Sequence, residues 1–197
     1  MGHARTSPRQ AGPAQETQQA VRRYLLYGLL PGWFIPGLLD WHLHRRTKIE
    51  ETSGLRESLI HALMMAEVGI PVLGALALQV NRRLMLIMGA AAVTHEVTAA
   101  WDVRTAHDST REVRPSEQHV HSFLETLPFT TLAAVACLHW DELRHPNPHN
   151  QGLRRKQPPL PKGYVLGILT AVGALIGVPY GEELVRCWRH RGTASDA

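Results

Sequence analysis

The chain has 197 residues and a formal net charge of +4, with a pI near 9.4. Its Lys and Arg residues are scattered, without the dense basic block and interleaved aromatics of a nucleic-acid-binding surface, so we expect no nucleic-acid partner. The two cysteines, Cys137 and Cys187, are too few for a disulfide framework and match no CxxC metal motif. The mean hydropathy of −0.16 is typical of a soluble protein, but polar ends dilute a strongly apolar middle.

Residues 1–19 are polar and show no periodic apolar face, so we expect a disordered tail there. A single transmembrane domain is predicted over residues 20–191, followed by a short polar tail over residues 192–197. The domain contains five apolar stretches, which are Tyr24–Leu43, Leu59–Val80, Leu84–Trp101, Phe123–Trp140 and Tyr164–Tyr180. Each stretch approaches the roughly 20 residues that a helix needs to cross the hydrocarbon core of a bilayer.

These stretches are apolar on nearly every side, whereas the helices of a small soluble bundle, the alternative, are expected to carry one apolar stripe. They also contain Gly and Pro, which membrane helices tolerate better than soluble ones. The sequence therefore predicts an all-α integral membrane bundle of about five transmembrane helices, which we expect in a bacterial inner membrane. Lys and Arg divide almost equally between the two membrane faces, so the orientation stays open.

Histidines and carboxylates recur at one membrane face if successive helices alternate in direction, and most of the 17 acidic residues fall on that face. Three helices carry a carboxylate and a histidine four residues apart, and a fourth carries them seven residues apart, so each pair lies on one helix face. The pairs are Asp40 and His44, Glu57 and His61, Glu117 and His121, and His95 and Asp102. Four such pairs at one depth indicate a shared site.

An ionisable side chain at membrane depth is costly unless it is paired or bound, so such groups usually face an interior site. Neutral imidazoles and carboxylates are natural ligands of multivalent cations. We therefore expect these eight residues to bind two metal ions, with iron favoured over zinc because the ligand set has no thiolate. Glu57 and Glu96 are the candidate catalytic carboxylates. The residues that stay open as replacements for a ligand are His42, His119, Glu67 and Glu125.

With these clustered ligands, the chain resembles the membrane-embedded di-iron enzymes of the fatty-acid hydroxylase, desaturase and alkane monooxygenase type, over roughly residues 40–125. It is also similar to the ferritin-like di-iron bundles, although their Glu-x-x-His spacing differs from the spacing here. The histidine boxes of the membrane enzymes are not reproduced, because the only HxxxH string, His145–His149, lies in a Pro-rich loop at the opposite face. The resemblance implies an oxidoreductase that acts on a membrane lipid or another apolar small molecule and receives electrons from an external reductase.

Two other functions stay open. A zinc-dependent membrane hydrolase of lipids, similar in its logic to the alkaline ceramidases, would use a metal-bound water and a carboxylate base such as Glu57 or Glu96. A metal-binding membrane protein without turnover, such as a carrier or a sensor, would need the ligands alone. The metal content of the purified protein distinguishes these functions.

Overall fold

The computed structural model describes residues 12–109, 113–148 and 152–195, which are almost entirely helical. The first part of the chain forms α1 (Pro13–Tyr24), the π-helical segment η1 (Leu25–Leu29), α2 (Leu30–Gly32), α3 (Phe34–Thr47) and the 3-10 turn η2 (Ile49–Glu51). The middle forms α4 (Gly54–Ala77), α5 (Arg82–His107), α6 (Pro115–Leu138) and α7 (Trp140–Arg144). The last part forms α8 (Lys162–Val172), the π-helical segment η4 (Gly173–Gly177) and α9 (Val178–Ser195).

Within the described residues, four helices are long and apolar enough to cross a membrane, namely Gly54–Ala77, Arg82–His107, Pro115–Leu138 and Lys162–Gly192. Their outer faces expose large apolar side chains; Ile70 and Leu86 are 71% and 74% exposed. Contiguous apolar surface of this kind is expected where lipid surrounds a helix. The predicted all-α membrane bundle is therefore confirmed. The first apolar stretch is helical as well, but it is divided among η1, α2 and α3, with a turn at Trp33.

Both predicted tails are shorter than expected. Helix α1 already begins at Pro13, so residues 13–19 are helical, and α9 continues to Ser195 through most of the predicted C-terminal tail. Pro at the first helical position, Glu16 in the first turn and Arg22 in the last turn all favour α1, since they suit the geometry and the dipole of a helix. Residues 1–11 and 196–197 of the predicted tails lie outside the described residues.

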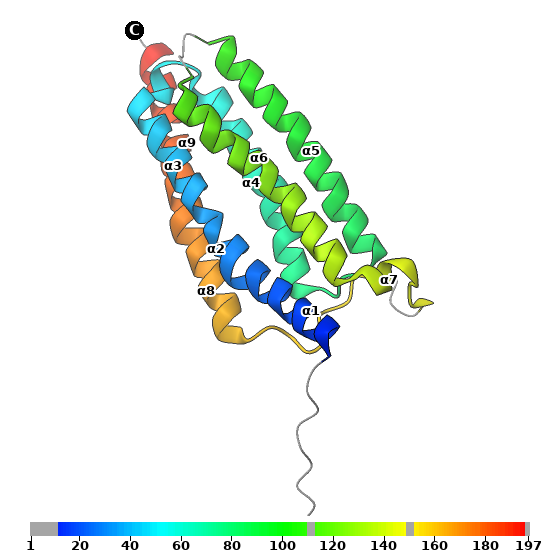
Figure 1. The fold of residues 1–197 in the computed structure, drawn as a ribbon. Coiled ribbons are helices and arrows are strands. Elements are labelled where there is room, and N and C mark those ends of the chain that lie inside the picture. The colour runs from blue at the N-terminus through cyan, green and yellow to red at the C-terminus, as the bar shows by residue number, and fades with distance from the viewer. Residues whose placement is uncertain (1–11, 110–112, 149–151, 196–197) are drawn as a thin grey trace, which may run out of the picture.

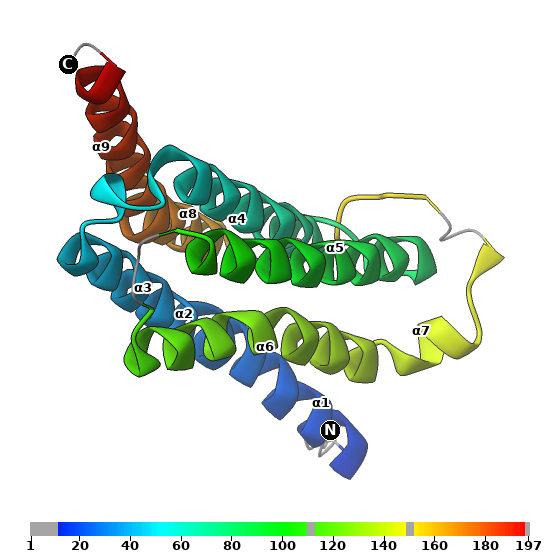
Figure 2. The same cartoon turned by 90° about the horizontal axis from the view of Figure 1, so that it is seen from above.

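The long helices close a ring. Helix α3 contacts α6, α6 contacts α5, α5 contacts α4, α4 contacts α9, and α9 contacts α3 again. Figure 1 shows these helices running in roughly one direction, with the end of α9, η2 and the start of α4 at one end, and Figure 2 shows α9 inclined to α4 and α5. We call that end of the ring the η2 end. The other end, which carries the start of α1 and helix α7, is called the α7 end (Figure 1).

The predicted site depends on successive helices that alternate in direction, and the helices of the ring do alternate. Helix α3 ends at the η2 end, α4 begins there, α5 ends there and α6 begins there (Figure 1). At the α7 end, the turn between α4 and α5 is held by Asn81, whose side chain accepts a hydrogen bond from Leu84 N (3.0 Å) and donates one to Gly152 O (2.9 Å). Polar motifs on four helices are thereby brought to one level.

Candidate metal centre

A cluster of buried ionisable side chains fills the ring at the η2 end. Seven of its members are no more than 4% exposed. They come from α3 (Asp40, His44), α4 (Glu57, His61), α5 (Asp102), α6 (Glu117) and α9 (Glu183). His121 of α6 completes the cluster with a half-buried side chain. Every helix of the ring therefore contributes to it.

Glu183 holds two imidazoles in the centre of this cluster. Its Oε2 lies 3.0 Å from His44 Nδ1, and its Oε1 lies 3.1 Å from His61 Nδ1. The two rings stack with centroids 4.6 Å apart and an interplanar angle of 6°. When each Nδ1–H donates to a carboxylate, the lone pair of each imidazole is left on Nε2, which is the arrangement that a second-shell carboxylate imposes on metal-binding histidines.

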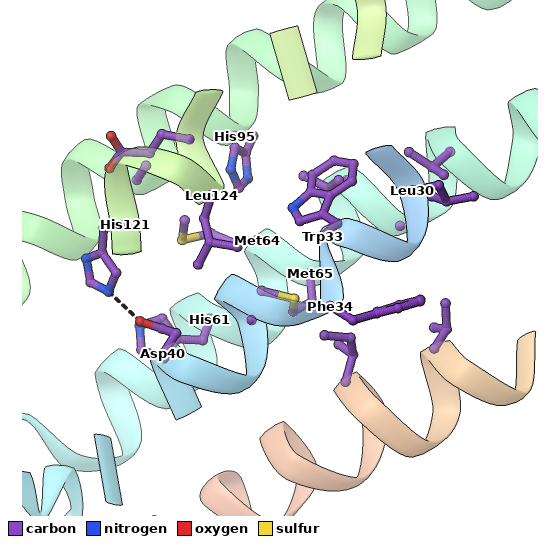
Figure 3. Close-up of a pocket in the computed structure, with 18 of the residues that line it drawn as sticks. Leu30, Trp33, Phe34, Asp40, His61, Met64, Met65, His95, His121 and Leu124 are labelled. Atoms are coloured by element: carbon purple, nitrogen blue, oxygen red, sulfur yellow. Dashed lines mark hydrogen bonds and ion pairs between the residues drawn. The ribbon is translucent and has the colours of Figure 1, made fainter. Parts of the chain in front are cut away.

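The Nε2 atom of His44 faces one group of acids. It lies 3.5 Å from Asp40 Oδ1 and 3.5 Å from Glu117 Oε1. His121 Nε2 approaches the same Asp40 oxygen to 2.7 Å, as the dashed line in Figure 3 marks. The second oxygen of Asp40 accepts a hydrogen bond of 2.9 Å from the hydroxyl of Tyr180, which fixes the carboxylate. Asp40, His44 and His121 form one group with the geometry to hold a metal ion.

The Nε2 atom of His61 faces a different group. It lies 3.3 Å from Asp102 Oδ1 and 3.9 Å from Glu57 Oε1, and these three residues form another group able to hold a metal ion. A further such group, His44, His61 and Glu183, joins the first two. The cluster is thus two half-sites, one around His44 and one around His61, connected through Glu183.

The spacing of the donor atoms is that of ligands around an ion. Two ligands each about 2.1 Å from one metal lie roughly 3.0–3.4 Å apart at octahedral or tetrahedral angles. The 3.3 Å from His61 Nε2 to Asp102 and the 3.5 Å from His44 Nε2 to Asp40 are close to this range. Within the described residues, His44 Nε2, His61 Nε2 and Asp102 Oδ1 are buried and make no hydrogen bond. Buried polar atoms are normally hydrogen-bonded, so these three atoms point to a ligand.

The charge of the cluster leads to the same conclusion. It combines five carboxylates with three histidines, and the buried polar side chains of the described residues include no Lys or Arg. Even if all three histidines were imidazolium ions, two of the five carboxylates would stay uncompensated. Burying an uncompensated charge costs several kcal/mol. Bound cations would compensate these charges and would also satisfy the three unpaired atoms.

A polar layer closes the η2 end above the cluster. Trp41 Nε1 donates a hydrogen bond of 3.0 Å to Glu182, and Arg186 pairs with both Glu182 and Glu50, which ties η2 to α9. Ile49 of η2 is fully buried beneath this layer. The layer separates the buried ligands from water at that end of the ring.

On its other side the cluster opens into an apolar cavity of about 140 Å³. Asp40, His61 and His121 line the end of the cavity nearest the buried cluster (Figure 3). Its walls are mainly apolar and aromatic, and they include Leu30, Trp33, Phe34, Met64, Met65 and Leu124. A dry cavity of about 150 Å³ accommodates a group the size of benzene. An apolar group can therefore lie directly against the cluster.

Of the eight predicted ligands, the structure brings seven together and separates His95. His95 and Asp102 share a face of α5, but seven residues place them about 10 Å apart along the helix, too far to share one ion. The side chain of His95 instead lies 3.7 Å from Glu67 Oε2, in the wall of the cavity. The two pairs at four-residue spacing on α3 and α4 are only about 6 Å apart along their helices, which explains why they meet.

The proposed catalytic carboxylates also differ in position. Glu57 is fully buried within the His61 half-site, whereas Glu96 is exposed on the outer face of α5. A helix turns about 100° per residue, so the neighbour of inward-facing His95 points away from the ring. Among the open replacements, His42 and His119 are exposed, Glu67 pairs with Thr98 (2.9 Å), and Glu125 lines the cavity.

Two residues of the site, Glu183 and Tyr180, were missed at the sequence level. Tyr180 is the last residue of the fifth apolar stretch and Glu183 follows it, and no histidine in that stretch marks a ligand position. The signal in the sequence is the acidic pair Glu182–Glu183 at the end of that uncharged stretch. The pair divides its roles, since Glu182 belongs to the closing layer and Glu183 holds the imidazoles.

No family model, no curated protein and no solved structure matches this chain. The arrangement of the site is therefore the basis on which a function is inferred.

Proposed function

We propose that the protein is a membrane-embedded oxidoreductase with two metal ions, most favourably iron, that acts on a lipid or another apolar substrate. One observation carries the proposal. Glu183 is hydrogen-bonded to the Nδ1 atoms of two stacked histidines, so that their Nε2 atoms face two separate groups of carboxylates. A salt-bridge network needs no such division, whereas a pair of metal ions does.

In this proposal each half-site binds one ion. The first ion is held by His44, His121, Asp40 and Glu117, and the second by His61, Glu57 and Asp102. Imidazole and carboxylate ligands without a thiolate suit iron or manganese, and facing helices of di-iron bundles supply the same mixture. A site richer in carboxylate than in imidazole favours these metals over zinc.

The cavity supports an apolar substrate. A substrate in this cavity would have a C–H bond beside the cluster, and the closing layer at the η2 end would keep bulk water away from it. The proposed reaction is R–H + O₂ + two electrons + two protons → R–OH + H₂O, in which the metal ions supply the activation of dioxygen. The electrons come from a separate reductase, and we propose a bacterial inner membrane as the location.

The metal content of the purified protein tests the proposal. We expect about two irons per chain, and about one after either His61→Ala or His121→Ala, because each substitution removes a ligand from a different half-site. His42→Ala and His119→Ala are matched controls, since these exposed histidines lie two residues from His44 and His121. They should leave both ions in place.

Three results would contradict the proposal. If the protein retains no metal after it has been supplied with iron, no metal-dependent function is left. Zinc as the tightly held metal would favour the hydrolase. Two irons without oxidation of any lipid in the presence of dioxygen and a chemical reductant would indicate storage or sensing rather than turnover.

A further inference from the structure

A second, larger cavity of about 760 Å³ lies at the α7 end of the ring. Residues of α1, η1, α4 and α6 line it, together with the segment that precedes α8. That segment is held against the end of α4, since Gln79 N donates to Arg154 O and Lys156 N donates to Ala77 O, each at 2.8 Å. The cavity is therefore bounded by fixed backbone on the side of the loop.

Three basic side chains line this cavity. Arg22 of α1, His139 just past α6, and Lys156 of the loop all line it, and the one carboxylate among its described lining residues is Glu142. Partial burial lowers the pKa of His139, and the nearby Lys156 and Arg22 lower it further. Burial likewise lowers the pKa of Lys156, with a contribution from Arg22. These cationic groups therefore lie close enough to repel one another, and a bound anion would relieve this repulsion.

Lys156 is fixed in position. Its Nζ donates a hydrogen bond of 2.8 Å to the carbonyl of Ala75, in the last turn of α4. This contact alone is a helix cap, in which a cation interacts favourably with the C-terminal end of the helix dipole. An ammonium group has three donors, however, so capping leaves two of them for a ligand. The cap orients the charge rather than neutralising it.

Leu, Val and Met side chains line part of this cavity. Leu30 and Val72 line both this cavity and the cavity beside the buried cluster, so these two side chains lie between the two spaces. The wall beside Leu30 is η1, whose π-helical turn leaves the carbonyl of Leu26 to accept a 2.6 Å hydrogen bond from Tyr164. Such π-helical turns often occur at functional sites.

The length of this path fits one acyl chain. Ala75, at the level of Lys156 Nζ, and Met64, beside the metal cluster, are eleven residues apart on α4, or about 16 Å. An acyl chain in one leaflet of a bilayer spans about 15 Å, half of the hydrocarbon thickness. A chain whose head lies at Lys156 would therefore bring its far end to the ligands.

We propose that the α7-end cavity is a head-group site for a single-chain anionic amphiphile of the fatty-acid type, whose chain passes Leu30 and Val72 and ends beside the metal cluster. The binding site is independent of metal. Its role in presenting the substrate rests on the proposed function. The carboxylate of the ligand would pair with Arg22 and Lys156, and oxidation would fall near the methyl end of the chain.

Palmitate binding to metal-free protein, prepared with a chelator, tests the site without enzyme activity. We expect saturable binding, and a loss of at least tenfold in affinity in the Arg22→Gln/Lys156→Gln double variant, because the variant removes both charge-assisted hydrogen bonds to the carboxylate. The amide of Gln can still donate to Ala75 O, so the fold is preserved. Arg23→Gln/Arg154→Gln is the matched control, since both arginines are exposed and neither lines the cavity. It should bind palmitate like the wild type.

The direction in which the acyl chain lies in the cavity can be tested separately. Trp33 lines the cluster-side cavity, so palmitate brominated near its methyl end should quench Trp33 fluorescence, and palmitate brominated near its carboxylate should not. The Trp33→Phe variant should lose this quenching, which identifies Trp33 as its source. Hexadecanol should bind more weakly than palmitate and be insensitive to the double variant.

The outcomes separate the two proposals. Absence of saturable binding, equal binding of hexadecanol, or quenching by the carboxylate-end bromine would overturn the head-group site even if two irons are present. Displacement of palmitate by an anionic diacyl phospholipid at equal concentration would overturn the single-chain assignment. Charge-dependent binding to a protein that never holds metal would retain the head-group site and reject the oxidoreductase.

Discussion

The two ends of the helical ring are filled in opposite ways. At the η2 end, five helices converge on buried acids and histidines beneath a closing polar layer. At the α7 end, the ring borders a large space whose lining combines apolar side chains with three basic ones. The first end has an excess of buried negative charge, and the second presents positive charge at its surface. One end is therefore suited to cations and the other to the head of an anion, with an apolar path between them.

The comparison depends most on Glu183, so its removal should have the largest effect. Glu183→Ala leaves both Nδ1 atoms without their acceptor and lets both imidazoles rotate. Because loss of a second-shell carboxylate typically weakens metal binding by about 10–100-fold, we expect both ions to be lost on dialysis. Metal analysis and a thermal melt measure the result.

The neighbouring residue supplies the control. Glu182→Ala removes an acceptor for Trp41 and Arg186 in the closing layer but touches no proposed ligand. It should retain both metal ions. Loss of only one ion in Glu183→Ala would mean that the half-sites are held independently, contrary to the role given to Glu183.

The path between the ends can be blocked without changing either end. Val68 lines the cluster-side cavity, and Val68→Phe adds a ring to a space of about 140 Å³. We expect unchanged iron content, loss of quenching by methyl-end bromopalmitate, and at least a tenfold loss of substrate oxidation. Ile70→Phe on the lipid-facing side of the same helix should change none of these. Normal oxidation in Val68→Phe would place the substrate elsewhere.

The sequence was sufficient to predict the η2 end because its chemistry repeats within single helices. A carboxylate and a histidine four residues apart share a face and lie within about 6 Å along the axis, so alternating helices bring Asp40, His44, Glu57 and His61 together. His95 fails this test because two turns separate it from Asp102. Glu183 was not predicted, since its role depends on lying between two histidines from other helices.

The α7 end was not predicted for a different reason. Its basic lining combines Arg22 from a segment expected to precede the first membrane span with Lys156 from a Pro-rich loop, more than a hundred residues away. No periodic pattern links them, since the pairing arises from backbone contacts that dock the loop on α4. The same is true of the π-helical turn at η1, which no composition signal marks.

His95 provides a smaller and sharper test of where the proposed metal site ends. Both ring nitrogens are buried without a hydrogen bond in the described part of the chain. An unsatisfied buried polar group costs about 1–3 kcal/mol, so His95→Met should stabilise the protein by about 1 kcal/mol and leave both irons in place. His61→Met, also on the inner face of the ring, should lose one ion. Loss of iron from His95→Met would extend the metal site into the cavity.

The smallest expected effect is a pH dependence at the α7 end. The pKa of His139 is lowered by burial and by Lys156 and Arg22, so the imidazole is neutral at pH 7 in the free protein. An anionic head group beside it would raise this pKa, despite the presence of Glu142. Binding is then linked to proton uptake, so affinity is greatest below the pKa of the free protein and falls as pH rises through the pKa of the complex.

Hexadecyl sulfate is the suitable probe for this linkage, because its charge does not change over the pH range in which a histidine titrates, about pH 5 to 8. We expect a loss of affinity of less than tenfold across that range, and no pH dependence in His139→Gln. Arg22 stays charged throughout, so binding persists at the upper limit. If affinity instead rises with pH, the bound head group lies away from His139, and the anion must be placed against Arg22 on the outer side of α1.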